Sequence, residues 1–172
     1  LSTITDADIT SFDYIYRGVD FGYAIDTLVY HEMAYDRKRR RLFIFNEFCK
    51  TGCGNAQAVE AIRSFNPQNR LVIADSAEPR TIDEFKNLGL NIRGAKKRPD
   101  SVRHGVKFLQ DLEEIVIDRN RCPNAANEFL TYELDRDARG ELKASFPDKN
   151  NHSIDAVRYA LNDVIKGPSI SF

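Results

Sequence analysis

Three aspartates stand at positions from which their carboxylates can act together. Asp20 ends a run that reads as a strand, Asp75 follows a continuous apolar run, and Asp155 lies in the first turn expected for the last helix. Because the carboxyl ends of neighbouring strands in an open α/β sheet border one crevice, we expect Asp20 and Asp75 to be neighbours. Three converging carboxylates without an obvious basic partner repel one another unless cations bind between them. Hard oxygen ligands of this kind favour Mg²⁺ or Mn²⁺ over zinc.

A histidine accompanies the third aspartate. His152 precedes Asp155 by three residues, so the two side chains share one side of the expected helix. Taken singly, each residue has a simpler explanation: Asp20 is a turn residue, and His152 lies near a helix cap. Asp75 and Asp155 are each explained as acids that complement a helix N-terminus. Their joint order along the chain favours a shared metal site over these separate explanations.

Cysteine spacing argues against a zinc site. Cys49 and Cys53 are three residues apart, Cys122 lies far away, and the chain has three histidines in all. A structural zinc site needs four ligands at suitable spacing. An odd number of cysteines in a chain without a secretory signal predicts reduced thiols.

Basic residues are concentrated in two segments, whereas acids gather mainly in others. The members of the two segments are Arg37, Lys38, Arg39, Arg40 and Arg41, and then Arg93, Lys96, Lys97, Arg98, Arg103 and Lys107. This distribution is expected for a surface with one basic face. From charge alone, solvated turns are the simpler interpretation.

Length and composition indicate a single globular domain. The 172 residues carry a net charge of −1, with 42% hydrophobic and 30% charged residues, which argues against disorder. No apolar run approaches the ~20 residues of a membrane span, so we expect no membrane segment. The N-terminal residues do not read as a signal peptide, and the absence of an initiator Met predicts a piece of a longer protein.

The first half of the chain predicts three strands in series, followed by alternating helices and strands. The strands are expected at 14–20, 27–35, 42–48, 71–74 and 90–93, with a charged hairpin tip at 36–40. Helices are expected after Asn55, on the apolar spacing of 56–62, and between Pro79 and Gly89.

The second half predicts three helices and a further strand at 115–117. The first helix begins at Asp100 or Ser101, the second at Pro123, and the last at Asn150 or Asn151, with a hairpin tip at 135–141. Their expected core-facing residues are Val102, Val106, Leu109 and Leu112, then Ala126, Phe129 and Leu130, then Ile154, Val157, Leu161 and Ile165. The fold class is therefore α/β, with a mixed sheet of a three-strand antiparallel meander plus parallel strands, flanked by helices.

This order of strands, helices and aspartates resembles the ribonuclease-H-like nuclease fold. Four local strings resemble, more specifically, the nuclease domain of phage large terminase subunits. They are G-V-D-F-G-Y at 18–23 followed by Asp26, A-D-S-A-E-P at 74–79, K-R-P-D-S-V at 97–102 and N-H-S-I-D-A-V-R-Y at 151–159. The resemblance covers residues 18–164, and its last string is the most specific. The G-x-D-x-G pattern alone also occurs in sugar kinases and actin-like ATPases.

The resemblance implies a metal-dependent endonuclease that cuts concatemeric viral DNA during packaging. It implies phosphodiester hydrolysis with two divalent ions, Mg²⁺ or Mn²⁺, held ~4 Å apart. By analogy with the fold, Asp20 bridges both ions, Asp155 holds the ion that generates the hydroxide, and Asp75 holds the ion facing the leaving 3′ oxygen. His152 is expected to orient Asp155 or to shuttle a proton, since an ordinary imidazole titrates near ~6.5.

The resemblance also implies partners and domain limits. Double-stranded DNA is the expected substrate, with phosphate contacts from Lys96, Lys97 and Arg98 and a second strip from Arg37, Lys38, Arg39, Arg40 and Arg41. Residues 14–166 form the expected nuclease domain, 1–13 the remnant of an interdomain connection, and 167–172 a C-terminal tail. An ATPase domain, a small terminase subunit and a portal are the expected partners in the host cytoplasm. The chain has no G-x-x-x-x-G-K-[ST] phosphate loop, so the ATPase must lie elsewhere.

Other functions remain open from the sequence. One is another enzyme of the same fold, such as a junction resolvase or an ATP-handling member. A second is a catalytically inactive module that holds DNA or a motor partner. Ribonuclease H relatives often place a further Glu on the helix after the third strand, where Glu60 is the acid present. Asp26 is a reserve metal ligand, although a turn residue is the simpler explanation.

Overall fold

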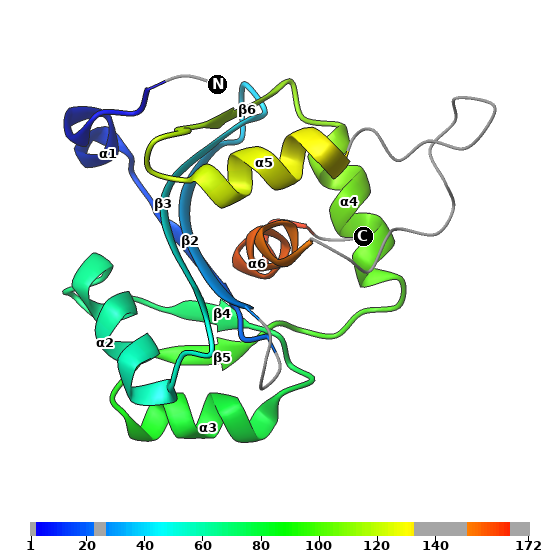
Figure 1. Cartoon of the computed structure of the whole chain (residues 1–172). Helices are drawn as coiled ribbons and strands as arrows, with labels where there is room; N and C mark the ends of the chain where they lie inside the picture. The colour runs from blue at the N-terminus through cyan, green and yellow to red at the C-terminus, as the bar shows by residue number, and fades with distance from the viewer. Residues whose placement is uncertain (1–2, 23–26, 133–150, 166–172) are drawn as a thin grey trace.

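The computed structural model describes residues 3–22, 27–132 and 151–165. Its strands are β1 (Tyr16–Asp20), β2 (Thr27–Asp36), β3 (Arg41–Thr51), β4 (Val72–Ala74), β5 (Ile92–Gly94) and β6 (Glu114–Ile117). Its helices are α1 (Asp6–Ser11), α2 (Asn55–Phe65), α3 (Pro79–Asn87), α4 (Ser101–Gln110), α5 (Pro123–Tyr132) and α6 (His152–Ala160). The strands form one sheet in the order β5-β4-β1-β2-β3-β6 (Figure 1).

The sheet is mixed, as the sequence predicts. β1, β2 and β3 form an antiparallel meander. β4 is parallel to β1, β5 is parallel to β4, and β6 adds to the other edge parallel to β3. Each parallel strand is reached through a helical crossover, and these crossovers supply helices to both faces of the sheet.

The meander strands are offset from their expected limits. The first strand begins at Tyr16 rather than Tyr14, and the next two continue to Asp36 and Thr51. β2 and β3 pair over their full length, from Thr27 opposite Thr51 to Asp36 opposite Arg41. Pairing between β2 and β3 therefore extends both strands beyond the residues whose apolar pattern predicts them.

A short helix, α1, lies in the segment expected to be connecting chain. Thr5 and Asp8 form a capping box, in which Thr5 N donates to Asp8 Oδ2 at 2.8 Å and Asp8 N donates to Thr5 Oγ1 at 3.2 Å. The preceding Ile4 is buried, and its N–H donates to the buried carboxylate of Asp118 at 2.8 Å. This segment is therefore attached to the end of β6.

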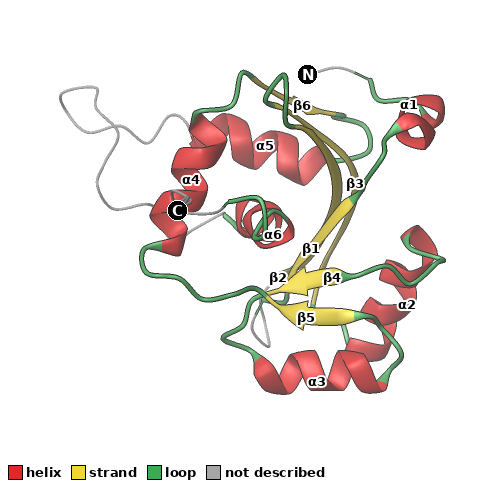
Figure 2. Ribbon diagram, turned by 180° about the vertical axis from the view of Figure 1, so that it is seen from behind, coloured by secondary structure: helices red, strands yellow, loops and turns green. Residues whose placement is uncertain are grey.

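Helices cover both faces of the sheet, as Figure 2 shows. α2 and α3 pack on one face, in a cluster that includes Val19, Ile62 and Phe85. α5 and α6 pack on the other face, in a cluster that includes Met33 and Val157, and α4 joins it through Leu109. No helix in the described part of the chain is long and apolar enough to cross a membrane.

Two of the expected core-facing residues are instead exposed. Val102 is 47% exposed and Leu130 is 51% exposed. Val102 lies in the first turn of α4, which borders an open cavity rather than the sheet, whereas Val106 and Leu109 one and two turns later are buried. Apolar spacing identified the correct face of α4 but not where that face leaves the core.

The last helix crosses the first strand at close range because β1 carries a glycine there. A Cβ at Gly18 would lie 2.0 Å from the carbonyl oxygen of Ala156 and 2.8 Å from the Cβ of Ala160. Side chains two residues apart in a strand share a face, so Gly18 and Asp20 both face α6. The close crossing therefore brings the start of α6 to the end of β1.

Candidate metal centre and basic cavity

Strand register brings the first two aspartates side by side. β1 and β4 are adjacent and parallel, with Val19 opposite Ala74, so Asp20 and Asp75 follow on neighbouring strands about 4.8 Å apart. The Asp20 carboxylate accepts a hydrogen bond from Gly22 N at 3.2 Å. Asp75 similarly accepts one from Ala77 N at 2.9 Å. These turns hold both carboxylates at the open ends of their strands.

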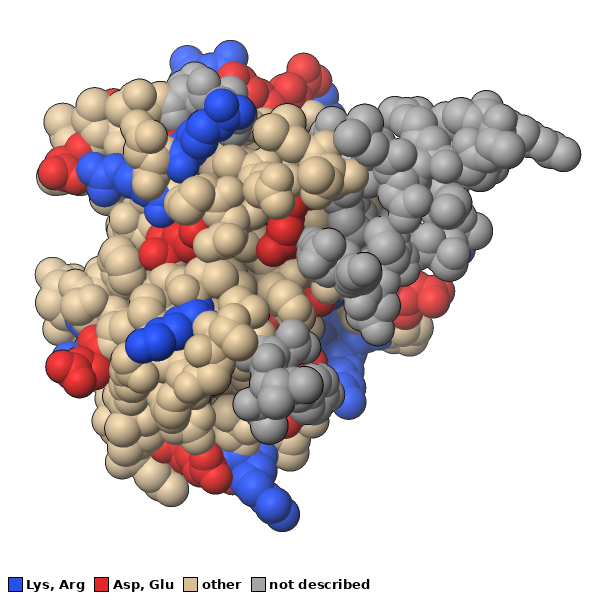
Figure 3. Space-filling model, in the orientation of Figure 1, with Lys and Arg blue, Asp and Glu red and all other residues tan. Residues whose placement is uncertain are grey.

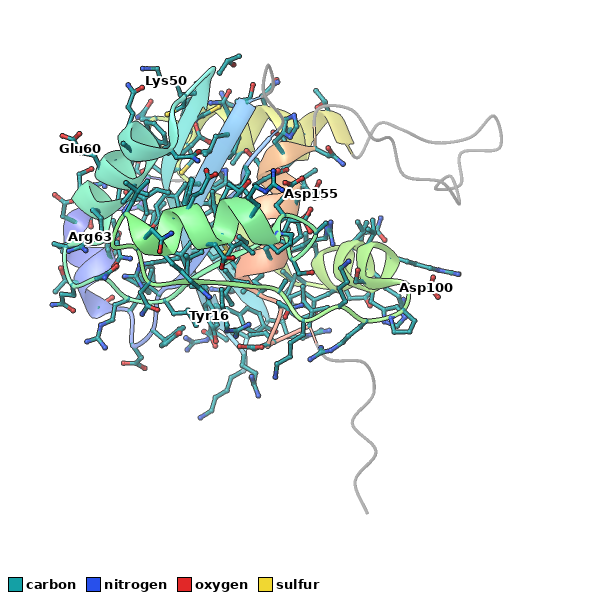
Figure 4. The ribbon with its side chains drawn as sticks, turned by 90° about the horizontal axis from the view of Figure 1, so that it is seen from below. Tyr16, Lys50, Glu60, Arg63, Asp100 and Asp155 are labelled. Carbon is teal, nitrogen blue, oxygen red and sulfur yellow. The ribbon has the colours of Figure 1, made fainter. Side chains whose placement is uncertain are left out.

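The first turn of α6 adds the third aspartate and the histidine. His152 Nδ1 lies 3.2 Å from Asp20 Oδ2, which links the helix to the end of β1. Asp155 follows one turn later and is partly buried; Figure 4 shows it on α6 near the middle of the molecule. The structure therefore places the four predicted residues at one end of the sheet, with Asp20 and Asp75 on neighbouring strand ends and His152 in contact with Asp20.

Asp155 affects the ionisation of Asp20, and all three carboxylates affect that of Tyr159. Burial, and to a smaller extent the negative charge of Asp155, raise the pKa of Asp20 to about 6, against the opposing effects of Gly22 N–H and His152. The pKa of Tyr159 is raised by burial and then by Asp155, Asp75 and Asp20 together. Three carboxylates around one partly buried position form an oxygen-rich set that suits a hard divalent cation.

An arginine one turn beyond Asp155 was missed by the sequence analysis. Arg158 is 7% exposed, and its Nη2 donates to Asp155 Oδ1 at 2.7 Å. Its guanidinium carbon lies 5.4 Å from the centre of the Tyr159 ring. The expectation that the acids lack a basic partner is therefore wrong for Asp155. The signal was an acid and a base at i and i+3 in the last helix.

A glutamate from α5 caps the helix that carries the site. Glu128 accepts hydrogen bonds from Ser153 N at 2.9 Å and from Ile154 N at 3.2 Å. The expected cap, Asn151, occupies the N-cap position but makes no capping hydrogen bond through its side chain. Burial raises the pKa of Glu128 to about 7, although the Ser153 and Ile154 N–H groups oppose that rise. This contact has no local signal in the sequence.

A second cluster lies deeper, behind α6. The ligand atoms of His31, Glu47 and Cys122 lie within 4.8 Å of one another. His31 Nε2 lies 2.8 Å from Ser153 Oγ, while the Glu47 carboxylate accepts from Ala125 N at 2.9 Å at the start of α5. These hydrogen bonds account for the burial of His31 and Glu47 without an ion. All three cysteines are free.

The basic loop predicted to contact DNA lies beside the acids. Lys96, Lys97 and Arg98 line a cavity of about 330 Å³ that also has Asp75 in its wall. Both lysines are exposed, and Arg98 Nη1 donates to the carbonyl oxygen of Ile165 at 2.9 Å. The loop is held to the end of α6 by Lys96 N, which donates to Asn162 Oδ1 at 2.8 Å.

The other basic segment lies at the opposite end of the sheet. Asp20 pairs with Val29, whereas the basic run follows Asp36, about 23 Å farther along β2. Three of its members are ion-paired: Arg39 with Asp36, Arg40 with Glu113 and Arg41 with Glu114. On the face shown in Figure 3, Lys and Arg are scattered among acids rather than gathered in one basic face.

Glu60 does not belong to the site. It is exposed on α2, which packs on the sheet face opposite α6, and Figure 4 shows it far from Asp155. Asp26, the expected hairpin tip at 135–141 and the tail at 167–172 lie outside the described residues.

Comparison with known proteins identifies the class of domain first. Over residues 20–163 the chain matches the family model described as the terminase RNase H-like domain. It is 40% identical over 170 residues to the terminase large subunit of Bacillus phage SPP1, covering 98% of this chain and 40% of that protein. It is 30% identical over 146 residues to the PBSX phage terminase large subunit of Bacillus subtilis (strain 168), covering 85% of this chain and 34% of that protein.

Solved structures agree on the fold. The large terminase nuclease domain of bacteriophage SPP1 with bound Mn superimposes with a TM-score of 0.84 at 39% identity, covering 94% of this chain and 92% of that one. The P22 large terminase nuclease domain gives 0.67 at 19% identity, covering 88% and 81%, which supports the fold alone. The chain belongs to the family of terminase large-subunit nuclease domains with a ribonuclease-H-like fold. It spans about two fifths or less of the length of the curated relatives that it matches.

Proposed function

We propose that this domain is a metal-dependent endonuclease that hydrolyses DNA phosphodiester bonds, the cutting domain of a viral DNA-packaging terminase. The observation that carries the proposal is the placement of Asp20 and Asp75 on neighbouring strand ends, beside the helix α6 that carries Asp155 and contacts Asp20 through His152. Carboxylates from two strand ends and one helix repel one another, and this repulsion is unfavourable unless a cation offsets it. The SPP1 relative, solved with bound Mn, supports the same interpretation.

The acidic residues and their neighbours have separate roles in the proposed reaction. Asp20, Asp75 and Asp155 would hold the divalent ions, Mg²⁺ or Mn²⁺, two by analogy with the fold. Bound ions of this kind supply an activated water and offset charge on the reacting phosphate. His152 lies 3.2 Å from the Asp20 carboxylate, so it orients that carboxylate and can move a proton at the edge of the site. Arg158 fixes the rotamer of Asp155 through its 2.7 Å hydrogen bond.

DNA contact is the task of the basic residues. Lys96, Lys97 and Arg98 lie beside Asp75 and bind phosphates near the cut. Arg37, Lys38, Arg39, Arg40 and Arg41 form a second, more distant strip. Phosphate contacts position a duplex without reading its sequence, which suits an enzyme with little base preference.

The wider assignments rest on the same resemblance. Residues 14–166 are the nuclease domain, preceded by a connection to an ATPase domain and followed by a short tail. In the full-length protein we expect a small terminase subunit and a portal as partners, in the host cytoplasm where viral DNA is packaged.

Plasmid cleavage tests the function directly. The purified chain, at fixed protein and salt concentration, should convert supercoiled DNA to nicked and linear forms in Mn²⁺ or Mg²⁺ but not in chelator. A four-way junction offered in equal molar amount should not be preferred to a linear duplex. Preference for the junction would favour a resolvase, and binding without cleavage in either metal would favour an inactive DNA-binding module.

A further inference from the structure

Beyond the acids, the structure contains a cavity suited to a second phosphate. The cavity of about 330 Å³ lies between the basic loop, the first turn of α4 and α6, and α4 and α6 lie side by side in Figures 1 and 2. Within its described lining Asp75 is the one acid, against Lys96, Lys97, Arg98 and Arg158. The cavity is therefore basic, and it adjoins the candidate metal centre through Asp75.

The first turn of α4 adds backbone N–H donors to this wall. Its N-cap residue, Asp100, has a left-handed backbone with φ 54° and makes no capping hydrogen bond through its side chain. The first turn carries no acidic residue, and Ser101 is exposed there in the cavity wall. The N–H groups of an uncapped helix start attract anions.

A buried arginine is an independent indication of an anion site. Arg158 lines the cavity with 7% of its surface exposed, and within the described residues its Nε has no hydrogen-bond partner. Gly105 of α4 makes room for it, because a Cβ there would lie 2.5 Å from Arg158 Cδ. A buried guanidinium nitrogen without a partner is costly unless a ligand or water completes its hydrogen bonds.

We propose that this cavity is a phosphate subsite that holds a backbone phosphate of the DNA strand being cut, adjacent to the scissile one. The inference rests on the proposed nuclease function and adds to it a second, fixed contact with the same strand. Arg158 and the start of α4 provide the buried part of the subsite, and the exposed Lys96 provides a further positive charge in its lining. The neighbouring phosphate then sets the depth at which the strand enters the metal centre.

A negative charge added to the cavity wall tests the subsite without weakening the fold. Ser101→Glu places a carboxylate in the first turn of α4, where a negative charge favours the helix. Gln57→Glu is the matched control, because it adds the same charge to the exposed first turn of α2 on the opposite sheet face. In chelator, Ser101→Glu should weaken duplex binding about tenfold, and Gln57→Glu less than twofold. Both variants should melt no lower than wild type.

A single neutral linkage locates the contact on the DNA. Duplexes carrying one methylphosphonate are cut by the wild type in Mn²⁺, and each cleavage pattern is compared with that of the unmodified duplex. We expect protection of the modified bond and, separately, reduced cleavage of one neighbouring bond. In Ser101→Glu the neighbouring effect should vanish while protection of the modified bond remains.

Three outcomes separate the two proposals. If the wild type cuts nothing in either metal, the nuclease function fails. If it cuts but only the modified bond is protected, or if Ser101→Glu keeps the neighbouring effect, the nuclease stands and the phosphate subsite is overturned. Equal binding losses in Ser101→Glu and Gln57→Glu would likewise overturn it, because they would reflect overall charge alone.

Discussion

At the scale of single residues, the site combines three carboxylates with local groups that hold each of them in place. His152 contacts Asp20, Arg158 donates a hydrogen bond to Asp155, and a backbone N–H donates one to Asp75. These contacts orient the carboxylates, but burial and then the charge of Asp155 still raise the pKa of Asp20. A metal ion would relieve the repulsion between the carboxylates most directly.

Replacing one carboxylate separates the metal site from a structural role. Asp155→Asn keeps size and helix geometry but removes a charged ligand, so cleavage in Mn²⁺ should fall at least about a hundredfold. His152→Ala removes a hydrogen bond to Asp20 rather than a ligand, and we expect a smaller loss. Asp83→Asn, an exposed acid on α3, is the control and should cut normally.

The measurement is nicking of supercoiled plasmid over several Mn²⁺ concentrations, with DNA binding followed in parallel. Binding by Asp155→Asn should stay equal or rise, because repulsion from phosphate decreases. Wild-type nicking by a folded Asp155→Asn protein would show that this residue merely complements the helix N-terminus, worth roughly 0.3–1 kcal/mol.

At the scale of elements, α6 is the component on which the site depends most. It supplies His152 and Asp155, crosses β1 at Gly18, and is capped from α5 by Glu128. None of these contacts touches substrate in the proposal. They fix where the first turn of the helix lies relative to the strand ends.

Gly18→Ala should therefore be strongly destabilising. The new Cβ would lie 2.0 Å from the carbonyl oxygen of Ala156, a backbone atom that cannot rotate away. We expect a loss of about 3 kcal/mol or more in the free energy of unfolding, the upper end for an overpacked core. Gly54→Ala is the control, because a Cβ there meets nothing within 4 Å.

Urea unfolding in chelator measures both glycine variants. A small effect of Gly18→Ala, comparable with that of Gly54→Ala, would mean that α6 can move away from β1 at little cost. Loss of Mn²⁺ binding in such a stable variant would still show that the crossing distance matters for the site.

The buried carboxylate of Glu128 predicts a pH dependence of stability. Its pKa is raised from the ordinary 4.5 to about 7 in the folded protein. Between these values the folded state binds more protons than the unfolded state, so this residue's contribution to the free energy of unfolding falls as pH rises. The fall is on the order of 2 kcal/mol. Glu128→Gln removes the titrating group and should therefore remove this term.

Unfolding of the two proteins at pH 5 and pH 8, without metal, isolates the effect. The stability of the wild type relative to Glu128→Gln should be higher at pH 5 than at pH 8. A difference that does not change with pH would show that Glu128 ionises in the folded protein as it does in the unfolded chain.

At the scale of the whole molecule, charged residues are distributed unevenly although the net charge is −1. The basic loop lies at the acidic end of the sheet, and the basic hairpin tip lies at the other end. Association with DNA should therefore depend on position, not on total charge.

Salt dependence of binding distinguishes the two basic segments. Replacing Lys96, Lys97 and Arg98 with Ala should reduce the slope of log K against log salt by up to about 2.7, at about 0.9 per phosphate contact. Replacing Arg37, Lys38 and Arg39 removes the same formal charge but should reduce the slope less, because that segment is distant and Arg39 is paired with Asp36.

Binding titrations of one duplex over a range of salt, in chelator, give both slopes. Equal reductions would indicate that the duplex extends over both ends of the sheet. An unchanged slope in the loop variant would mean that these residues are a solvated turn.

The sequence by itself determined the sheet order of the meander, the helices and the places of the four site residues. Asp20 and Asp75 could be placed because an apolar run sets where a strand ends, and the parallel pairing of β1 and β4 then makes those ends neighbours. His152 and Asp155 could be placed because helical spacing is local. The position of α1 was also encoded locally, in the capping box of Thr5 and Asp8.

Only the tertiary structure decided what holds the site together. Glu128 and Ser153 are 25 residues apart, and Asp20 and His152 are 132 apart, so no local pattern announces either contact. The exposure of Val102 and the burial of Arg158 follow from how α4 lies against α6. Periodicity identifies the face of a helix, but the packing of its neighbours determines which part of that face is covered and which part borders a cavity.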